Sequence, residues 1–305
     1  MASETQGVAR SPWIAAVLSL FSTGLGHIYS GQIVTGLILF LMSLLFAPVA
    51  VLAAHLGSST VILIGLLLAA FVVVAIYLFA VADSFRAARK AGQHYQLRDY
   101  NRGIVYFLFL LVGVFYPVGV AQYLRASVFE AFLIPTASEA PNFLPGDHVL
   151  VNKTTYQRHT PDRGDVIVFR SPKERRLNWI KRVIALPGDT VEVTGTEVII
   201  NGKKLEHDRV SPAALPFSLD EGSEIFYEFN AGRRYRILIA PADEKIADLP
   251  KQTVPEGYCF VLGDNRNRSM DSRGVGVIPL AEIIGSVQYI FWPAESWSRF
   301  GACQD

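Results

Sequence analysis

Residues 164–169 have the sequence GDVIVF, which joins a turn to a strand-forming run. A Gly-Asp pair is a turn signal, and the apolar, mostly β-branched residues after it are typical of a strand. The pairs at 146–147 and 188–189 precede HVLV and TVEV, and a fourth pair lies at 263–264. This repeated order of turn and short apolar run predicts that the second part of the chain is mainly β.

A hairpin is predicted around residues 230–232, because apolar side chains alternate with polar ones on both sides of this turn. The alternating residues are Ile225, Tyr227 and Phe229 before the turn and Tyr235, Ile237 and Ile239 after it. Residues 125–305 are expected to form one β-rich domain, which is long enough for a single large core. The stretch 205–252, rich in Pro, Asp and Glu, is expected to be an inserted lobe.

The first part of the chain, residues 1–124, has a membrane composition. The 72 positions between Arg10 and Asp83 contain no Asp, Glu, Lys or Arg, and residues 103–124 form a second gap of 22. About 20 apolar residues suffice to cross a bilayer as a helix. These gaps predict about four transmembrane helices, at 13–30, 33–55, 60–82 and 103–123.

The loop at residues 83–102 sets the orientation of these helices. It carries five basic residues against two acidic ones, Arg86, Arg89, Lys90, Arg98 and Arg102 against Asp83 and Asp99. The positive-inside rule places such a loop in the cytoplasm, so the last helix delivers residues 125–305 to the exported side. Counting back through three spans places the N-terminus outside as well. If the segment 13–30 lies only in the membrane interface, the N-terminus is inside and the export of residues 125–305 is unchanged.

The first predicted helix ends in a glycine-rich turn, residues 24–32 with the sequence GLGHIYSGQ. This turn loosely resembles the tight hairpin of small two-helix membrane modules of the TM2 type.

Composition excludes several classes of function. Residues 125–305 carry 24 acidic and 22 basic residues, so no nucleic-acid partner is expected. The six histidines are scattered and form no His-x-x-x-His pair, so no metal site is expected. Cys259 and Cys303 are too few for a disulfide scaffold, and either buried thiols or one bridge would fit.

Ser138 and Lys181 are the candidate catalytic pair. A hydrolase without a histidine partner for its serine needs another base, and an amine serves only when it is stripped of water. A free lysine has a pKa of about 10.4, and burial lowers the pKa of a lysine by up to several units. Lys181 lies in a run apolar enough to be buried, with Arg182 expected on the opposite face of the strand.

Four boxes of the chain resemble, in order and spacing, those of type I signal peptidases. They are PTAS at 135–138 with Pro141, Gly146 and Asp147; IKRVIALPGD at 180–189; LGDNRNRSMDSRG at 262–274; and GSVQYIFWP at 285–293. The resemblance covers about residues 125–298. It implies a signal-peptidase-like β fold for the exported catalytic domain, behind an α-helical transmembrane region.

The resemblance also implies a role for each matching residue. Ser138 would attack the scissile carbonyl, and a neutral Lys181 would be the general base. Thr136 and the backbone amide of Ser138 would form the oxyanion hole, and Ser269 would orient the lysine. The supporting residues would be Asp264, Asn265 and an ion pair of Asp271 with Arg273.

The implied activity is removal of N-terminal signal peptides from exported proteins by a serine endopeptidase that needs no cofactor. The implied substrates are extended segments of preproteins with small residues at the first and third positions before the cut. These would add a strand to an exposed sheet edge. The implied location is the bacterial inner membrane, with several spans, and the partners are the bilayer and, as a further candidate, the export machinery.

Glu139 departs from this family, which usually has methionine after the nucleophile. A carboxylate about 6 Å from the lysine would favour its charged form by about 2 to 3 kcal/mol at an effective dielectric near 20, which opposes a basic role. Because neighbours on an extended chain point to opposite sides, we expect Glu139 to face water or headgroups.

Three other functions remain open at this point. A Ser-His-Asp enzyme using His148 or His159 is one, although the chain has no Gly-x-Ser-x-Gly elbow. A transporter is another, although the predicted spans lack acidic residues and a repeat. The third is a catalytically degenerate relative that binds exported chains or scaffolds a membrane complex, and Glu139 favours it.

Overall fold

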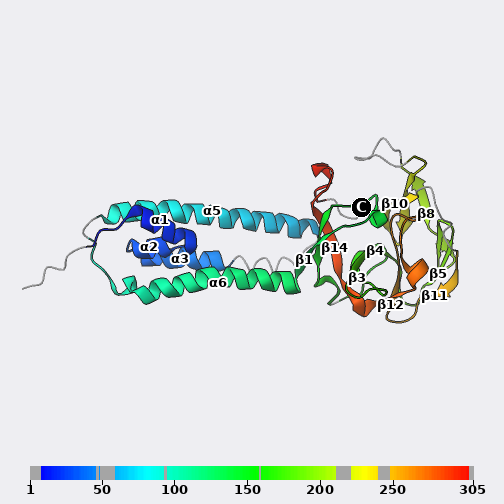
Figure 1. Cartoon of the computed structure of the whole chain (residues 1–305), viewed down its shortest axis with the longest axis horizontal. Helices are drawn as coiled ribbons and strands as arrows, with labels where there is room; N and C mark the ends of the chain where they lie inside the picture. Colours follow the sequence, from blue (N-terminus) through cyan, green and yellow to red (C-terminus); the bar gives the residue numbers. More distant parts are fainter. Residues whose placement is uncertain are drawn as a thin grey trace, which may run out of the picture. The chain divides into compact units, whose positions relative to one another are not determined.

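The structure is a computed structural model that describes residues 8–45, 48, 59–92, 95–157, 159–210, 221–239 and 248–301. The chain divides into two compact units, Met1–Val128 and Phe129–Asp305. The first unit is built of helices and the second mainly of strands (Figure 1).

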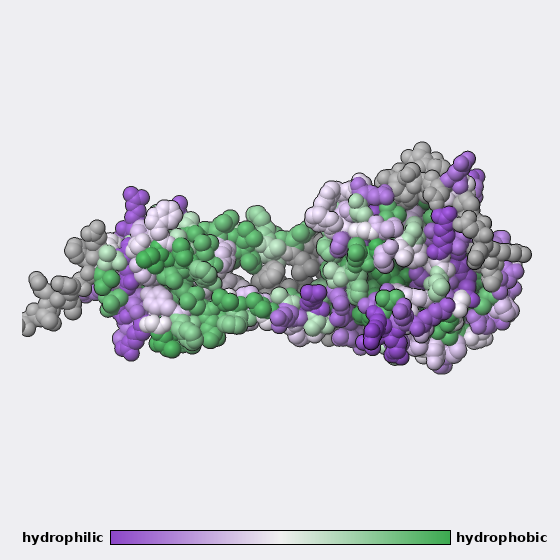
Figure 2. All heavy atoms as spheres, in the orientation of Figure 1, coloured by the Kyte–Doolittle hydropathy of each residue, from purple (hydrophilic) through white to green (hydrophobic). Residues whose placement is uncertain are grey.

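The helical unit contains two helices of membrane-spanning length. Its described elements are α1 (Pro12–Phe21), α2 (Leu25–Tyr29), α3 (Ile33–Leu44), α5 (Ser59–Ala91), the 3-10 turn η1 (Asp99–Asn101) and α6 (Gly103–Ser127). Leu67–Ala91 within α5 and the whole of α6 are long and apolar enough to cross a bilayer. Hydrophobic side chains cover much of their surface (Figure 2), which is compatible with membrane spans.

The predicted spans 60–82 and 103–123 fall within α5 and α6. The predicted helix 13–30 is not continuous, because α1 ends at Phe21 and Gly24 has a φ of +87° before α2 begins. Helix α3 has 12 residues. At a rise of 1.5 Å per residue its length is about 18 Å, short of the roughly 30 Å hydrocarbon core. Most of residues 46–58 lie outside the described part of the chain.

The glycine-rich turn lets α1, α2 and α3 approach one another closely. A side-chain carbon added at Gly24 would lie 2.1 Å from the carbonyl oxygen of Gly36, and one added at Gly26 would lie 2.1 Å from that of Ala15. His27 is buried on α2, and its Nε2 lies 3.1 Å from Asp83 Oδ2 on α5. The short helices are thereby held against one of the long ones.

The described residues of the β unit form three antiparallel sheets. The largest has seven strands in the order β1 (Phe129–Leu133), β2 (His148–Asn152), β14 (Ile283–Trp292), β3 (Val166–Arg170), β4 (Asn178–Ala185), β12 (Tyr258–Leu262) and β13 (Ile278–Pro279). The second has the order β11 (Leu249–Thr253), β5 (Thr190–Thr194), β6 (Glu197–Ile200) and β7 (Lys203–Lys204). The third has the order β10 (Arg233–Ile239), β9 (Glu224–Asn230) and β8 (Glu206–Arg209). Short helical elements connect them: η2 (Ala137–Glu139), η3 (Thr155–Gln157), α7 (Ser272–Val275), η5 (Leu280–Glu282) and η6 (Trp297–Arg299).

The strands predicted after three of the Gly-Asp pairs are β2, β3 and β5. The predicted hairpin is also present, as β9 and β10. Its turn residues Ala231 and Gly232 both have positive φ, +52° and +82°, which suits the twist of a tight hairpin. Within the stretch 205–252, strands β8 to β10 form a sheet of their own, whereas β11 pairs with β5.

Three of the four Gly-Asp pairs share one turn geometry. Gly146, Gly164 and Gly188 have φ values of +90°, +93° and +84°, in the region that favours glycine. In each case the aspartate accepts a hydrogen bond from the backbone N–H three residues earlier, that of Leu144, Asp162 or Leu186. Each aspartate also pairs with an arginine: Asp147 with Arg299, Asp165 with Arg233 and Asp189 with Arg163. The carboxylate therefore fixes both its own turn and a distant segment.

A buried carboxylate joins the three-stranded sheet to the loop after β12. Glu228 on β9 accepts hydrogen bonds from Arg266 at 2.7 and 2.6 Å and from the Tyr235 hydroxyl at 2.7 Å, and lies 2.8 Å from His207 Nε2. Burial raises the pKa of Glu228, but these partners, Arg266 foremost, outweigh burial and lower the pKa to about 2. The carboxylate is therefore ionised over the physiological range of pH.

We expect Gly26→Val to destabilise the helical unit by about 1 to 3 kcal/mol, because the added carbons would overlap the backbone of α1. Gly119→Val on α6 is the matched control, since a side-chain carbon at Gly119 meets nothing within 4 Å. Thermal unfolding of the detergent-solubilised protein measures both. Equal melting temperatures for the two variants would contradict the close packing of the turn.

Glu228→Gln should cost about 3 to 5 kcal/mol at neutral pH, because it leaves the Arg266 charge buried without a carboxylate. The pKa of Glu228 is lowered on folding from an ordinary 4.5 to about 2, so its stabilisation is present above pH 4.5 and is lost as pH falls toward 2. The stability difference between wild type and variant should shrink over that interval. Glu224→Gln, on the same strand but in an exposed pair with Arg209, should cost under about 1 kcal/mol. If the stability difference between wild type and Glu228→Gln stayed constant down to pH 2, the ionised carboxylate of Glu228 would not be its source.

Candidate active site

Ser138 lies in a short turn that the 262–274 box holds in place. The chain leaves β1 at Leu133 and forms the 3-10 turn η2 over Ala137–Glu139. The backbone N–H of Asn265 donates to the carbonyl oxygen of Ser138 at 3.1 Å, and Asn265 Nδ2 donates to that of Ala137 at 3.1 Å. Asn265, which belongs to the 262–274 box, therefore fixes the backbone of the serine turn.

Lys181 lies in the middle of β4, between β3 and β12 of the seven-stranded sheet. It is only 4% exposed, and its Nζ donates to Ser138 Oγ at 2.9 Å, to Glu139 Oε1 at 2.7 Å and to the carbonyl oxygen of Ile180 at 2.8 Å. The structure thus brings the serine and the lysine into direct contact across 43 residues of sequence. All three donors of the ammonium group have an acceptor.

Thr136 lies on the exposed side of the same turn. Its Oγ1 donates to Ser138 Oγ at 3.3 Å. The threonine hydroxyl is therefore close to the serine oxygen, and a carbonyl group that reached Ser138 Oγ would also meet Thr136.

The expectation that Glu139 faces water or headgroups is wrong. The side chain is buried, at 1% exposure, and its Oε1 accepts hydrogen bonds from Lys181 and, at 3.2 Å, from Ser138 Oγ. The expectation assumed an extended chain, in which neighbouring side chains point to opposite sides. In a 3-10 turn with three residues per turn they are about 120° apart, so both can reach one amine.

The environment of Glu139 raises its pKa from 4.5 to about 7. Burial is the main cause, and the nearby Asp264 carboxylate adds to it. Lys181 and Arg182 oppose these effects by favouring the charged form. The carboxyl group therefore changes its charge close to neutral pH.

Ser269 does not make the hydrogen bond to the lysine that the family resemblance implies. Its Oγ is buried and has no hydrogen-bond partner among the described residues. The side chain packs against Gly263, where an added side-chain carbon would lie 2.1 Å from Ser269 Oγ and 2.6 Å from the carbonyl oxygen of Ser138. In this chain Glu139, rather than Ser269, accepts a hydrogen bond from Lys181 Nζ.

A second buried ion pair lies beside the first. Arg182 donates to both oxygens of Asp264 at 2.7 Å, and its guanidinium lies 4.1 Å from the centre of the Tyr235 ring. Asn142 Nδ2 donates to Asp264 Oδ2 at 2.7 Å and so connects this pair to the segment that follows the serine turn. Lys181 and Arg182 therefore point to different sides of β4, as predicted, and each meets a carboxylate.

Asp271 and Arg273 form the implied ion pair, with the two arginine nitrogens Nε and Nη2 at 2.8 and 2.7 Å from the carboxylate. Asp271 Oδ2 also accepts the backbone N–H of Gly263 at 3.0 Å. Asp271 thus ties the end of the 262–274 loop to Gly263, the residue before Asp264.

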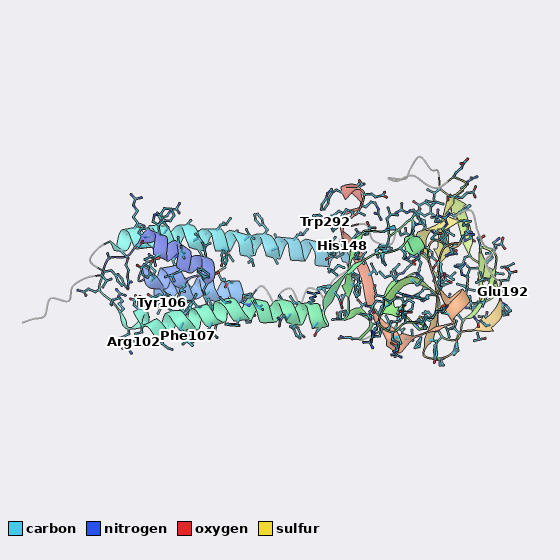
Figure 3. All side chains as sticks on the ribbon, viewed as in Figure 1. Arg102, Tyr106, Phe107, His148, Glu192 and Trp292 are labelled. Carbon is cyan, nitrogen blue, oxygen red and sulfur yellow. The ribbon has the colours of Figure 1, made fainter. Side chains whose placement is uncertain are left out.

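The histidine alternatives receive no support. The ring of His148 packs against Phe291, with centroids 5.9 Å apart, and lies opposite Trp292 in the strand register (Figure 3). His159 is bonded to the carbonyl oxygen of Thr160. No hydrogen bond links either imidazole to Ser138 in the part of the chain that the structure describes, and no group of three or more metal-ligating side chains occurs there.

Sequence reasoning assigned no role to Arg182 or Asn142 and misplaced Glu139. A charged residue next to Lys181 inside an apolar strand was a signal that Arg182 needs a buried partner. Asn142 carried no such signal, because its bond to Asp264 joins residues 122 positions apart.

Comparison with known proteins agrees with the motifs. The family model "Signal peptidase, peptidase S26" matches residues 107–292. A probable signal peptidase I-1 of Synechocystis is 34% identical, over 60% of this chain and 81% of that protein. Signal peptidase I of Aquifex aeolicus is 33% identical, over 60% of this chain and 83% of that protein. A crystal structure of a signal peptidase I from Enterococcus faecalis is 36% identical and covers 41% of this chain and 95% of that one, with a TM-score of 0.27.

The matched region includes Ser138, Lys181 and the whole 262–274 box. It also includes most of α6, whereas α1 to α5 lie outside it. The chain therefore belongs to the signal peptidase family, peptidase S26, and is a serine endopeptidase of the signal peptidase I type.

Proposed function

We propose that this enzyme removes N-terminal signal peptides from exported proteins, with Ser138 as nucleophile and Lys181 as general base. The observation that carries the proposal is the 2.9 Å contact between Lys181 Nζ and Ser138 Oγ, made by an amine that is almost completely buried. A serine hydroxyl becomes a strong nucleophile when a group in contact with it removes its proton. Lys181 must be neutral at that moment, because an ammonium group has no lone pair.

Thr136 and the backbone N–H of Ser138 are proposed as the oxyanion hole. Thr136 Oγ1 already lies beside Ser138 Oγ, so it can turn its hydrogen toward the oxygen of a carbonyl under attack. Asn265 supports this geometry, because its two hydrogen bonds hold the backbone of Ala137 and Ser138. Asp264 with Arg182, and Asp271 with Arg273, are proposed to keep the loop around the serine rigid.

The substrate is proposed to bind as an added strand. Strand β1 is at the edge of the seven-stranded sheet, and the chain continues from it directly to the serine turn. An extended peptide paired with this edge would place its backbone along β1 and its scissile bond near Ser138. This mode suits a signal peptide, whose small residues before the cut leave room for close backbone approach.

The helical unit is proposed to anchor the enzyme in the bacterial inner membrane, with the β unit on the exported side. The two span-length helices and the basic loop between them support this orientation. Confinement of enzyme and preprotein to one plane would raise their rate of encounter, and the bilayer and the export machinery are the proposed neighbours.

One observation favours a second function, that of a degenerate peptidase that binds exported chains without cutting them. The carboxylate of Glu139 lies 2.7 Å from Lys181 Nζ, and such a contact stabilises the protonated amine. A lysine held in that form would not accept the serine proton.

The processing assay separates these two functions. Detergent-purified wild type should cut a preprotein, and Ser138→Ala and Lys181→Ala should each lose activity by a factor of about 10³ or more. Lys203→Ala, an exposed lysine on β7, is the control and should process normally. If folded wild type binds the preprotein but leaves it intact, the degenerate reading is correct.

Thr136→Val should lower kcat by about 10² to 10³, the usual effect of losing one oxyanion donor, without changing the melting temperature. The threonine is exposed, so no core packing is lost. Thr136→Ser keeps the hydroxyl and should retain most of the activity. A valine variant with wild-type turnover would remove Thr136 from the oxyanion hole.

A further inference from the structure

Three side chains at the site form one closed set of hydrogen bonds. Lys181 Nζ bonds to Ser138 Oγ and to Glu139 Oε1, and Ser138 Oγ donates to the same Oε1 at 3.2 Å. The lysine and the glutamate are each at most 4% exposed, so bulk water does not compete for these bonds. A proton that leaves the serine therefore has a carboxylate acceptor within reach, either directly or through the amine.

We propose that Glu139 is a third catalytic residue, which takes a proton from Lys181 so that the neutral amine can accept the proton of Ser138. The inference rests on the proposed function and explains how a lysine in contact with a carboxylate can still act as a base. The amine does not have to be neutral in the resting enzyme. It first transfers one proton to Glu139 and then, with the lone pair that this leaves on Nζ, accepts the proton of the serine.

The step balances as follows for acylation. One N–H bond of the ammonium first breaks and an O–H bond forms at Glu139 Oε1, which leaves a lone pair on Nζ. The Oγ–H bond of Ser138 then breaks and an N–H bond forms at Nζ. The Ser138 Oγ electron pair forms the bond to the scissile carbon, and the carbonyl π pair moves to the oxygen. On collapse, the C–N bond breaks, and the proton held by Glu139 returns through Nζ to the leaving nitrogen. Deacylation repeats the transfers with water in place of Ser138.

This route creates no additional charge in the buried site. The resting pair holds one positive and one negative charge, on Lys181 and Glu139. After the attack, the positive charge is still on the amine and the negative charge has moved from the carboxylate to the oxyanion. The cost of burying a new charge, which is large in an apolar environment, is thereby avoided.

Two further observations support the assignment. Ser269, the residue expected to orient the lysine, has an Oγ without a hydrogen-bond partner among the described residues, so its place beside the amine is taken by Glu139. The charged groups that influence Glu139 are Lys181 and Arg182 from β4 and Asp264 from the loop after β12, and together with burial they bring its pKa to about 7. A general base works best with a pKa near the operating pH.

The test is the pH dependence of kcat/KM for a signal-peptide substrate in wild type, Glu139→Gln and Glu139→Met. Wild-type activity should fall as pH decreases through about 7, because Glu139 becomes protonated and cannot accept a proton. Both variants should lose about 10²-fold or more at pH 8, mainly in kcat, because no carboxylate remains to take the proton of Lys181. Glu282→Gln, in an exposed pair with Arg175, is the carboxylate control and should keep the wild-type profile.

Infrared difference spectra provide a readout that does not depend on activity. As the pH is raised through about 7, wild type should lose the C=O band of one protonated carboxyl group. This change should be absent from Glu139→Gln. Variants that are folded and as active as wild type at pH 8, or more active, would overturn the role of Glu139 while leaving Ser138 and Lys181 as the dyad. If Glu139→Gln fails to fold, the activity of Glu139→Met at pH 8 provides the same test. Absence of any Ser138-dependent cleavage in wild type would overturn the proposed function and this inference with it.

Discussion

Burial of two adjacent cations on β4 is the constraint on which the β unit depends. Lys181 and Arg182 occupy consecutive positions of a strand in the middle of a sheet, and both are almost fully buried. A buried charge without a partner is very unfavourable, so two carboxylates have to reach this strand from elsewhere in the chain. Glu139 arrives with the serine turn, and Asp264 arrives with the loop after β12. Because each buried cation needs a carboxylate, the site consists of three segments that are distant in sequence: β4, the serine turn and the loop after β12.

Much of the β unit could be predicted from local sequence. Left-handed glycines followed by aspartate marked three turns correctly, because this geometry is determined by φ at the glycine and by a hydrogen bond three residues away. The position of Lys181 was also inferable, since its flanking residues are apolar enough to require burial. The partners of Asp264 and Glu228 were not inferable, because bonds between distant segments leave no periodic pattern in a sequence.

Two local assumptions failed for identifiable reasons. Glu139 was expected to point away from Ser138 on an extended chain, but the turn η2 rotates both side chains toward one amine. The run without charges at the N-terminus was divided into helices by length alone. Gly24, with its positive φ, interrupts the first of them, and close contact between Gly24 and Gly36 favours a folded hairpin over a straight span. Hydropathy indicates affinity for lipid, but it does not distinguish a crossing helix from a short one packed against its neighbours.

Helix α6 continues almost directly into strand β1. The helix ends at Ser127, the strand begins at Phe129, and Ser138 follows Ser127 by 11 residues. A fully extended chain of that length spans at most about 40 Å. If α6 is the membrane anchor proposed above, this short linker would keep Ser138 close to the bilayer and would restrict hydrolysis to bonds near the membrane surface.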